Sequence, residues 1–185
     1  MIIITGMPGS GKDEFIKVAR SMGWKDYHMG DTVRKYARQE NVENTDKAIG
    51  AFASQERKAH GMGIWAERVI LEIREDRKVI IDGLRNIEEF DAFRKAFPAL
   101  VMVAIHTDRE ERLKRIMKRH RSDDVKDLGE LIGRDERELS WGIGNAISLS
   151  HYMIVNDSTL EEFKENARKL LLRIEKENPV YLADM

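Results

Sequence analysis

The sequence contains no cysteine, and this absence excludes disulfide bonds, thiolate metal ligands and a thiol nucleophile. It also lacks an excess of either charge, because 32 lysine and arginine residues stand against 33 aspartate and glutamate residues, a formal net charge of -1. A chain without a broad basic field is not expected to bind nucleic acid or acidic membranes. Any anion-binding function must therefore rest on local clusters of basic side chains.

Long apolar runs are absent too, so the sequence offers no candidate membrane span. The opening run MIIIT is far shorter than the hydrophobic region of a signal peptide. We therefore expect a soluble, cytoplasmic protein without a membrane partner, and the missing cysteine fits a reducing compartment. No repeat, low-complexity segment or linker is present, so 185 residues with 42% hydrophobic content predict one domain, residues 1–185. The sequence does not predict an oligomeric state.

Short β-rich apolar runs alternate with longer segments of helical periodicity along the chain. The predicted strands are residues 2–5, 26–29, 79–82, 100–106 and 152–156. Each segment between them is long enough for a crossover helix, which favours a parallel sheet covered by helices on both faces. The sequence therefore predicts a three-layer α/β fold around a five-stranded parallel sheet.

Two stretches without strand signals predict helical insertions into this core. The first, about residues 41–77, is broken by the run GMG at 61–63, and the second, about 121–148, is arginine-rich before it turns apolar. Insertions at the carboxyl ends of parallel strands lie beside the ligand crevice, so we expect an acceptor-side insertion and a lid. The predicted core is residues 1–40, 78–120 and 149–178. Two capping boxes, Thr107 with Glu110 and Ser158 with Glu161, predict the starts of the last core helices.

The loop after the first predicted strand matches the phosphate-binding pattern G-x-x-x-x-G-K. It consists of Gly6, Met7, Pro8, Gly9, Ser10, Gly11 and Lys12. A β-branched run precedes it and a segment of helical period follows it, which is the context that the motif requires. Glycines let backbone N–H groups converge on phosphate oxygens, the helix N-terminus adds its positive dipole, and Lys12 reaches the terminal phosphates. A plain tight turn is the alternative, but it needs neither three glycines nor a lysine. The predicted fold is thus a P-loop NTPase fold.

Asp13 stands where this motif usually has a serine or threonine hydroxyl that meets magnesium. As an acid in the first helical turn it can simply interact with the helix dipole, which is worth about 0.3 to 1 kcal/mol. A carboxylate beside a bound triphosphate is repelled unless a cation lies between them, however, and Mg²⁺ prefers hard oxygen ligands. We therefore favour a metal role for Asp13. Asp82, at the end of a buried apolar strand, is predicted as the second acidic partner, with a cap of the following turn as its alternative.

Two short motifs resemble nucleoside monophosphate kinases. The run GDTVR at 30–34 is similar to the adenylate kinase motif Gly-Asp-x-x-Arg, whose arginine holds the acceptor phosphate. The run DGLR at 82–85 resembles that family's Asp-Gly-x-Pro-Arg, although the proline is missing and the arginine comes one place early. The resemblance implies that Asp31, Arg34 and Arg85 lie at an acceptor-phosphate site. By themselves, Asp31 and Arg34 also fit a helix N-cap followed by an exposed arginine.

The segment SHYMIVNDSTLEE at 150–162 looks like the ending of dephospho-CoA kinases, Ala-Asp-Tyr-x-Ile-x-Asn followed shortly by Leu-Glu-Glu. The likeness to these kinases spans nearly the whole chain, strongest in the phosphate loop and looser elsewhere. The chain is thus similar to an archaeal group of P-loop proteins related to adenylate kinase and dephospho-CoA kinase. This resemblance implies a kinase-like fold and no particular reaction.

Further arginines are candidates for contacts with phosphate groups. Arg134 and Arg137 are similar to lid arginines that fold over a triphosphate, although a solvated charged helix explains them nearly as well. Arg119 is the basic residue of the preceding helix that lies nearest to this lid. Arg57, in the first insertion, is a candidate contact for the acceptor phosphate. The basic run KRIMKRHR at 114–121 lacks the interleaved aromatics of an RNA-binding surface.

Together these patterns predict a Mg²⁺-dependent phosphotransferase that moves the γ-phosphoryl group of ATP to a nucleotide or another small phosphorylated acceptor. The predicted catalytic residues are Lys12, Arg34, Arg85, Arg119, Arg134 and Arg137. The alternative is a regulatory ATP-binding switch or slow ATPase that acts through a protein partner. Arg34 and Arg85 discriminate between the two, because a switch needs no acceptor-phosphate site. A GTPase is disfavoured, since the sequence has no Asn-Lys-x-Asp guanine motif.

Overall fold

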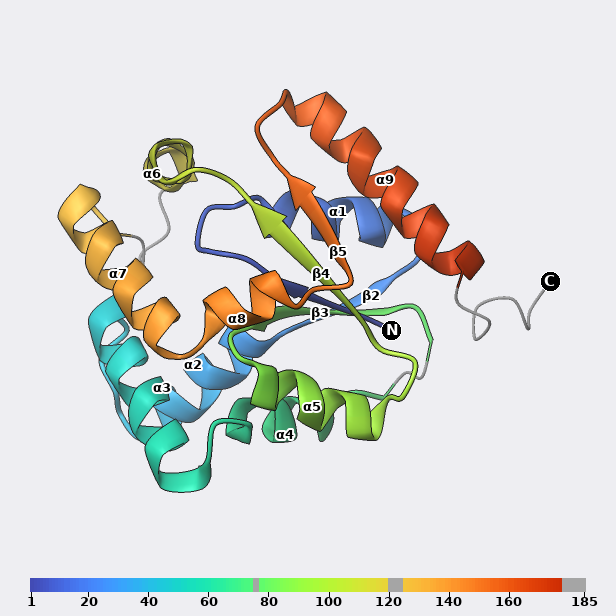
Figure 1. Ribbon diagram of the computed structural model, residues 1–185. Coiled ribbons are helices and arrows are strands. Elements are labelled where there is room, and N and C mark those ends of the chain that lie inside the picture. Colours follow the sequence, from blue (N-terminus) through green and yellow to red (C-terminus); the bar gives the residue numbers. More distant parts are fainter. Residues whose placement is uncertain (75–76, 120–124, 178–185) are drawn as a thin grey trace.

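Five parallel strands form one sheet at the centre of the molecule (Figure 1). The computed structural model describes residues 1–74, 77–119 and 125–177. The strands are β1 (Ile2–Thr5), β2 (Lys25–His28), β3 (Val79–Leu84), β4 (Val101–His106) and β5 (Tyr152–Val155). Their order in the sheet is β2-β3-β1-β4-β5, which places β1 in the middle. The five-stranded parallel sheet predicted from the sequence is confirmed.

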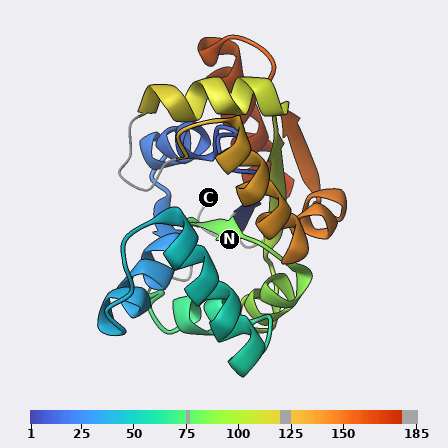
Figure 2. The ribbon, with the colours of Figure 1, turned by 90° about the vertical axis from the view of Figure 1, so that its left-hand side faces the viewer.

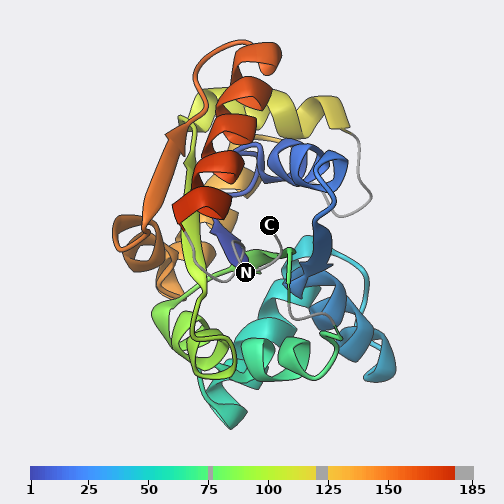
Figure 3. The same ribbon diagram turned by 90° about the vertical axis from the view of Figure 1, so that its right-hand side faces the viewer.

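Alternation along β1 supplies the hydrophobic cores on both faces of the sheet. Ile2 and Ile4 belong to one core cluster and Ile3 to the other, because successive side chains of a strand point to opposite faces. The first face is covered by α1 (Lys12–Ser21) and α9 (Leu160–Glu177). Helices α2 (Met29–Gln39), α4 (Ile64–Ile70), α5 (Ile87–Ala96) and α8 (Ile143–Ser148) cover the second face (Figures 1 and 3). The predicted three-layer α/β arrangement is therefore correct.

The two predicted insertions contain helices that meet at one side of the molecule. Helix α3 (Asp46–His60) is separated from α4 by the break at Gly61, and α7 (Leu128–Ser140) follows α6 (Arg109–Arg119). Figure 2 shows α7 above α3 on this side of the molecule. The division into core, acceptor-side insertion and lid stays a prediction, and its residues 75–76, 120–124 and 178 lie outside the described ranges. Among the helices within those ranges, none combines the length and apolar character needed to cross a bilayer.

Both predicted capping boxes are displaced by one residue. Helix α6 is capped by Asp108, whose carboxylate accepts from the backbone N–H of Glu111 at 3.0 Å. At the start of α9, Thr159 rather than Ser158 caps the helix, and the Thr159 N–H donates to the Glu162 carboxylate at 3.1 Å. The sequence pattern did not predict these two helix starts to the residue. In each case the adjacent residue also has a side-chain oxygen that can cap the helix.

Candidate functional site

The phosphate loop connects β1 to the N-terminus of α1, as its sequence predicts. Gly6 has a φ of 147°, and a Cβ atom there would lie 2.4 Å from the Ile105 carbonyl oxygen of the neighbouring strand. Gly11 has a φ of 108°, and a Cβ there would lie 2.3 Å from the Asn156 amide nitrogen. Only glycine fits these two positions. Among the described residues no side chain forms an N-cap hydrogen bond at α1, so the positive end of this helix faces the loop without a capping group.

A buried set of polar side chains holds the back of this loop. Asn156 Nδ2 donates to the Ser10 carbonyl at 2.9 Å, and the Thr107 hydroxyl lies 3.0 Å from the same oxygen. Arg112 Nη1 donates to the Pro8 carbonyl at 3.1 Å, and both Arg112 Nη atoms donate to Asp135 of α7. Sequence reasoning missed these supporting contacts, since each joins residues far apart in the chain.

Lys12 begins α1 and lies folded over the loop. Its Nζ donates to the Gly6 carbonyl at 2.8 Å and to the Met7 carbonyl at 3.2 Å, and only 8% of the residue is exposed. Burial lowers the pKa of Lys12 to about 8, although the nearby carboxylate of Asp82 acts in the opposite direction. The ammonium group is thus held only by neutral carbonyl acceptors. Phosphate oxygens would take their place and form stronger, charge-assisted hydrogen bonds.

Asp82 is the last member of a chain of hydrogen bonds and ion pairs that runs from α1 to the centre of the site. Arg20 pairs with Asp26, Asp26 Oδ2 lies 2.7 Å from His28 Nε2, and His28 Nδ1 lies 3.3 Å from Asp82 Oδ2. The contact with Asp82 raises the pKa of His28 to about 9 against the opposing effect of burial. Burial alone would raise the pKa of Asp82, but the His28 hydrogen bond and the charge of Lys12 outweigh it and lower that pKa. Asp82 therefore stays ionised at neutral pH.

Three cavities adjoin one another along the carboxyl ends of the strands. The outer cavity, about 810 Å³, is lined by Gly9, Gly11, Lys12, Asp13, Glu14, Lys17, Glu111, Arg115, Lys118, Asn156, Ser158 and Leu160. The middle cavity, about 510 Å³, is lined by Pro8, Gly9, Lys12, Asp13, His28, Gly30, Asp31, Arg34, Asn44, Asp82, Gly83, Arg85 and Arg134. The inner pocket, about 100 Å³, is lined by residues of α2, α3, α4 and α7 and by residues next to these helices and after β3. The phosphate loop thus separates the outer from the middle cavity.

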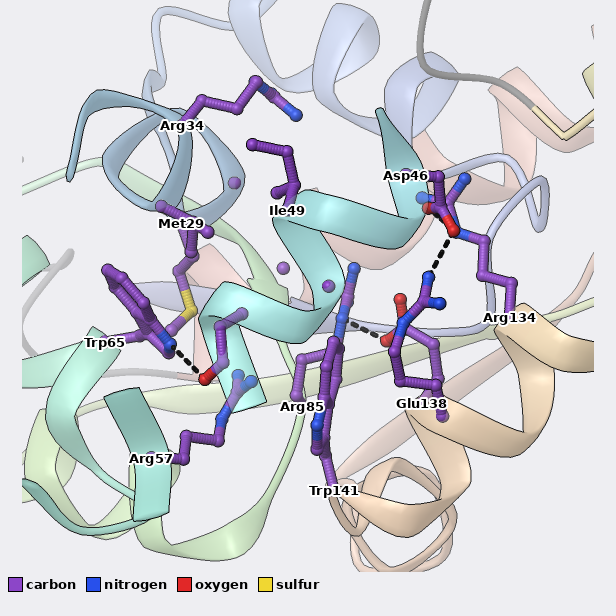
Figure 4. A pocket seen from close by; sticks show the side chains of 16 residues that line it. Met29, Arg34, Asp46, Ile49, Arg57, Trp65, Arg85, Arg134, Glu138 and Trp141 are labelled. Atoms are coloured by element: carbon purple, nitrogen blue, oxygen red, sulfur yellow. Dashed lines mark hydrogen bonds and ion pairs between the residues drawn. The ribbon is translucent and has the colours of Figure 1, made fainter. Parts of the chain in front are cut away.

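The arginines predicted for the acceptor side, and Arg134 and Arg137 predicted for the lid, line the middle cavity, the inner pocket or both. Arg34, Arg85 and Arg134 line both, whereas Arg57 and Arg137 line only the inner pocket. Figure 4 shows Arg34, Arg57, Arg85 and Arg134 reaching this region from different elements. Five arginines from four separate segments of the chain therefore gather within one part of the site.

Carboxylates hold most of these arginines in place. Arg85 pairs with the buried Glu138 and Arg137 with Asp46, while Arg134 Nε lies 3.2 Å from the same Asp46. Arg34 Nη2 donates to Asp31 at 2.7 Å, as two residues one helical turn apart can do. The acidic partners Asp46 and Glu138 were not predicted, because nothing local in the sequence marks them. The side chain of Arg119 lies outside the described part of the structure.

The sheet order, the phosphate loop and the helices on both faces define a P-loop protein of the kinase-like α/β class. The family model described as "AAA domain" matches residues 2–141. A UPF0200 protein of Thermoplasma volcanium is 57% identical over 171 residues, which cover 92% of this chain and 96% of that protein. A UPF0200 protein of Methanosarcina mazei is 42% identical over 174 residues, covering 92% and 93%. The chain belongs to the UPF0200 family, and the predicted membership in an archaeal P-loop group is confirmed.

Solved kinase structures share this fold. A gluconokinase from Sinorhizobium meliloti superposes with a TM-score of 0.60 at 17% identity, covering 98% of this chain and 96% of that chain. A dephospho-CoA kinase from Campylobacter jejuni gives a TM-score of 0.58 at 16% identity, covering 96% and 98%. At these identities the likeness concerns the fold alone.

Proposed function

We propose that the protein transfers the γ-phosphoryl group of ATP to a nucleotide or another small phosphorylated acceptor. The observation that carries this proposal is the order of the three cavities. Gly9, Lys12 and Asp13 line both the outer and the middle cavity, and Arg34, Arg85 and Arg134 line both the middle cavity and the inner pocket. A donor in the outer cavity and an acceptor in the inner pocket would therefore meet in the middle cavity, between Lys12 and the arginines.

The outer cavity is the proposed site of the nucleoside part of ATP. Its phosphates would follow the loop toward the N-terminus of α1, where backbone N–H groups and the helix dipole favour negative charge. Lys12 would leave the Gly6 and Met7 carbonyls and pair with the terminal phosphates. We propose Arg134 of α7, which lines the middle cavity, and Arg119 at the end of α6 as the lid cations of the reaction. Arg137, predicted as a third lid cation, lines only the inner pocket and pairs with Asp46, so we assign it to the acceptor side.

The carboxylates that line the middle cavity fit a magnesium ion. Asp13 and Asp82 both lie there, and Asp82 Oδ1 is buried without a hydrogen-bond partner among the described residues. Both supply hard, anionic oxygens of the kind that Mg²⁺ prefers. No cluster of three or more metal-binding side chains exists in the described ranges, so water and phosphate oxygens would complete the coordination. When bound, Mg²⁺ would neutralise charge on the phosphates.

The chemistry needs little covalent help from the protein. An acceptor oxygen bonds to the γ-phosphorus while the bond from that phosphorus to the β–γ bridging oxygen breaks, and ADP leaves with the electron pair. If the acceptor oxygen belongs to a hydroxyl, its proton passes to the carboxylate of Asp31, which lines the same cavity. Lys12, Arg34 and Arg85 stabilise the charge that spreads over the transferred group.

The test is incubation of the protein with ATP and Mg²⁺ and a panel of acceptors, followed by measurement of ADP and of the phosphorylated product. Nucleoside monophosphates, dephospho-CoA and small phosphorylated metabolites form the panel. ADP formed in step with a phosphorylated acceptor supports phosphotransfer. ADP formed in step with inorganic phosphate alone supports the slow ATPase or switch instead.

A further inference from the structure

The inner pocket contains hydrogen-bond donors that the protein itself does not use. Arg57 lies on α3, and only 5% of its surface is exposed. Its Nη2 donates to the Glu89 carboxylate at 2.8 Å, whereas Nε and Nη1 have no hydrogen-bond partner among the residues that the structure describes. Figure 4 shows the Arg57 guanidinium turned toward the pocket. A buried cation with unused donors is unfavourable until an anion occupies the space beside it.

The lining of the inner pocket is positively charged even when its own carboxylates are counted. Five arginines line it, against the carboxylates of Asp46 and Glu138, and Glu89 lies behind Arg57. Asp46 is already paired with Arg134 and Arg137, and Glu138 is paired with Arg85. These carboxylates hold the arginines apart and in place, so a net positive charge remains for a ligand.

The aromatic side chains of the pocket do not offer a stacking face for a nucleobase. The guanidinium of Arg57 lies 4.4 Å from the centre of the Trp141 ring and covers its face. Trp65 is fully buried, and its ring packs against Tyr36 and Phe52 at centroid distances of 6.0 and 5.9 Å. Recognition at the inner end of the site therefore relies on charge and hydrogen bonds rather than on stacking.

We propose that the acceptor is a compact molecule with an anionic group at each of two ends. One group lies at the junction of the middle cavity and the inner pocket, held by Arg34, Arg85 and Arg134. The other lies in the inner pocket against the unused Nε and Nη1 of Arg57. This inference rests on the proposed function and narrows its acceptor class. Carboxylate and phosphate both match the forked donors of an arginine, so either can supply the inner group.

The experiment compares matched acceptors in which a second anionic group replaces one hydroxyl. Glycerol 3-phosphate is paired with glycerate 3-phosphate, which has a carboxylate in place of the primary alcohol, and ribose 5-phosphate with ribose 1,5-bisphosphate, which has a phosphate on the anomeric oxygen. AMP and CMP represent acceptors whose far end is a base. The value of kcat/KM is measured for each acceptor in the presence of ATP and Mg²⁺. For at least one two-anion acceptor we expect a kcat/KM about tenfold or more above that of its one-anion partner and of both nucleotides. The pair that shows the preference identifies the inner group.

Arg57→Lys tests whether Arg57 is the source of that preference. Lysine keeps a cation beside Glu89 but loses the forked donors, so the preference is expected to fall about tenfold to a hundredfold through KM. The Kd for ATP should change less than the KM of the two-anion acceptor, because Arg57 does not line the outer cavity. Arg68→Lys is the matched control, because Arg68 is a half-buried arginine that, like Arg57, pairs with a glutamate, here Glu56, but does not line the pocket. Arg57→Gln with Glu89→Gln is a second variant that leaves no buried charge unpaired.

Each outcome decides for or against the second anionic group. The inference is overturned if kcat/KM is equal within both pairs, or if the preference survives in both Arg57 variants. Transfer to one-anion acceptors would still support the proposed function in either case. If neither these probes nor the wider acceptor panel is phosphorylated, the proposed function fails, and the melting-temperature shifts caused by the same probes decide about the site. The anion site is supported if a two-anion probe raises the melting temperature more than its one-anion partner does and Arg57→Lys abolishes this difference. Equal melting-temperature shifts within both pairs overturn it.

Discussion

Arg112 is expected to be a main support of both the fold and the phosphate loop. It is 4% exposed, and its Nη1 and Nη2 donate to the Asp135 carboxylate at 2.9 and 2.6 Å. Asp135 is only 1% exposed, so water cannot replace Arg112 as its partner. Removing one member of a buried ion pair costs about 3 to 5 kcal/mol, and the exposed Arg109 would compensate the remaining Asp135 charge only in part. Arg112→Gln should therefore lower the free energy of unfolding by about this amount.

Thermal and urea unfolding measure this loss directly. In a chain of this size each kcal/mol corresponds to about 2 to 4 °C in Tm, so Arg112→Gln should melt about 6 to 20 °C below the wild-type protein. Arg112 also donates to the Pro8 carbonyl, so the variant should bind ATP more weakly at a temperature where it is still folded. Adding Asp135→Asn should recover part of the stability, because no buried charge then remains.

Arg109→Gln is the matched control, since Arg109 contacts the same carboxylate. Its Nε lies 3.1 Å from Asp135 Oδ2, but its side chain is 51% exposed. An exposed ion pair is worth about 1 kcal/mol or less, so this variant should melt within about 4 °C of the wild type. Equal losses in the Arg109 and Arg112 variants, or a wild-type Tm for Arg112→Gln, would refute the reasoning from burial.

Three further predictions concern the middle cavity. Lys12→Ala should abolish tight ATP binding, measured by calorimetry, and turnover, measured by ADP release, while the melting curve stays close to that of the wild type. Unchanged ATP affinity would contradict the phosphate-loop assignment. Asp13→Asn should raise the Mg²⁺ concentration needed for half-maximal activity, and Asp13→Ser should recover part of the loss. If the midpoint of the Mg²⁺ titration is unchanged, the only role left for Asp13 is its interaction with the helix dipole. His28 has a folded pKa raised to about 9 from 6.5, so its stabilisation is fully present below pH 6.5 and is lost as pH rises through 9. The stability of the wild type relative to His28→Gln, from urea unfolding, should fall over this window by on the order of 2 to 3 kcal/mol, and a pH-independent difference would contradict it.

The sheet and the phosphate loop were predictable because their signals are local. A β-branched run, a loop with three glycines and a helical segment follow one another within the first 22 residues, and every strand except β2, whose sequence is KDYH, is a compact and mainly apolar run. The ion pairs of the site depend on contacts between distant segments. Arg112, for example, is buried against Asp135, which lies 23 residues later in the chain and on another helix. The sequence shows the charge of such a residue but not its partner.

The same limit applies to the acceptor side. Arg34, Arg57 and Arg85 were expected near an acceptor phosphate, and the structure shows all three around the inner pocket. Their acidic partners were not expected, since Glu138 and Asp46 lie in segments that meet only in the folded chain. The role of each arginine in the reaction stays a prediction that the variants described above test.

The most direct test of the central claim follows the γ-phosphate of ATP. The protein is incubated with Mg²⁺ and ATP labelled at the γ-position, together with the acceptor panel, and the label is located by chromatography and ³¹P NMR. We predict that the label appears in a phosphorylated acceptor, and that Arg34→Gln slows this transfer by about tenfold or more while ATP binding is retained. Label found only in inorganic phosphate, at the same rate with and without every acceptor, would contradict the account.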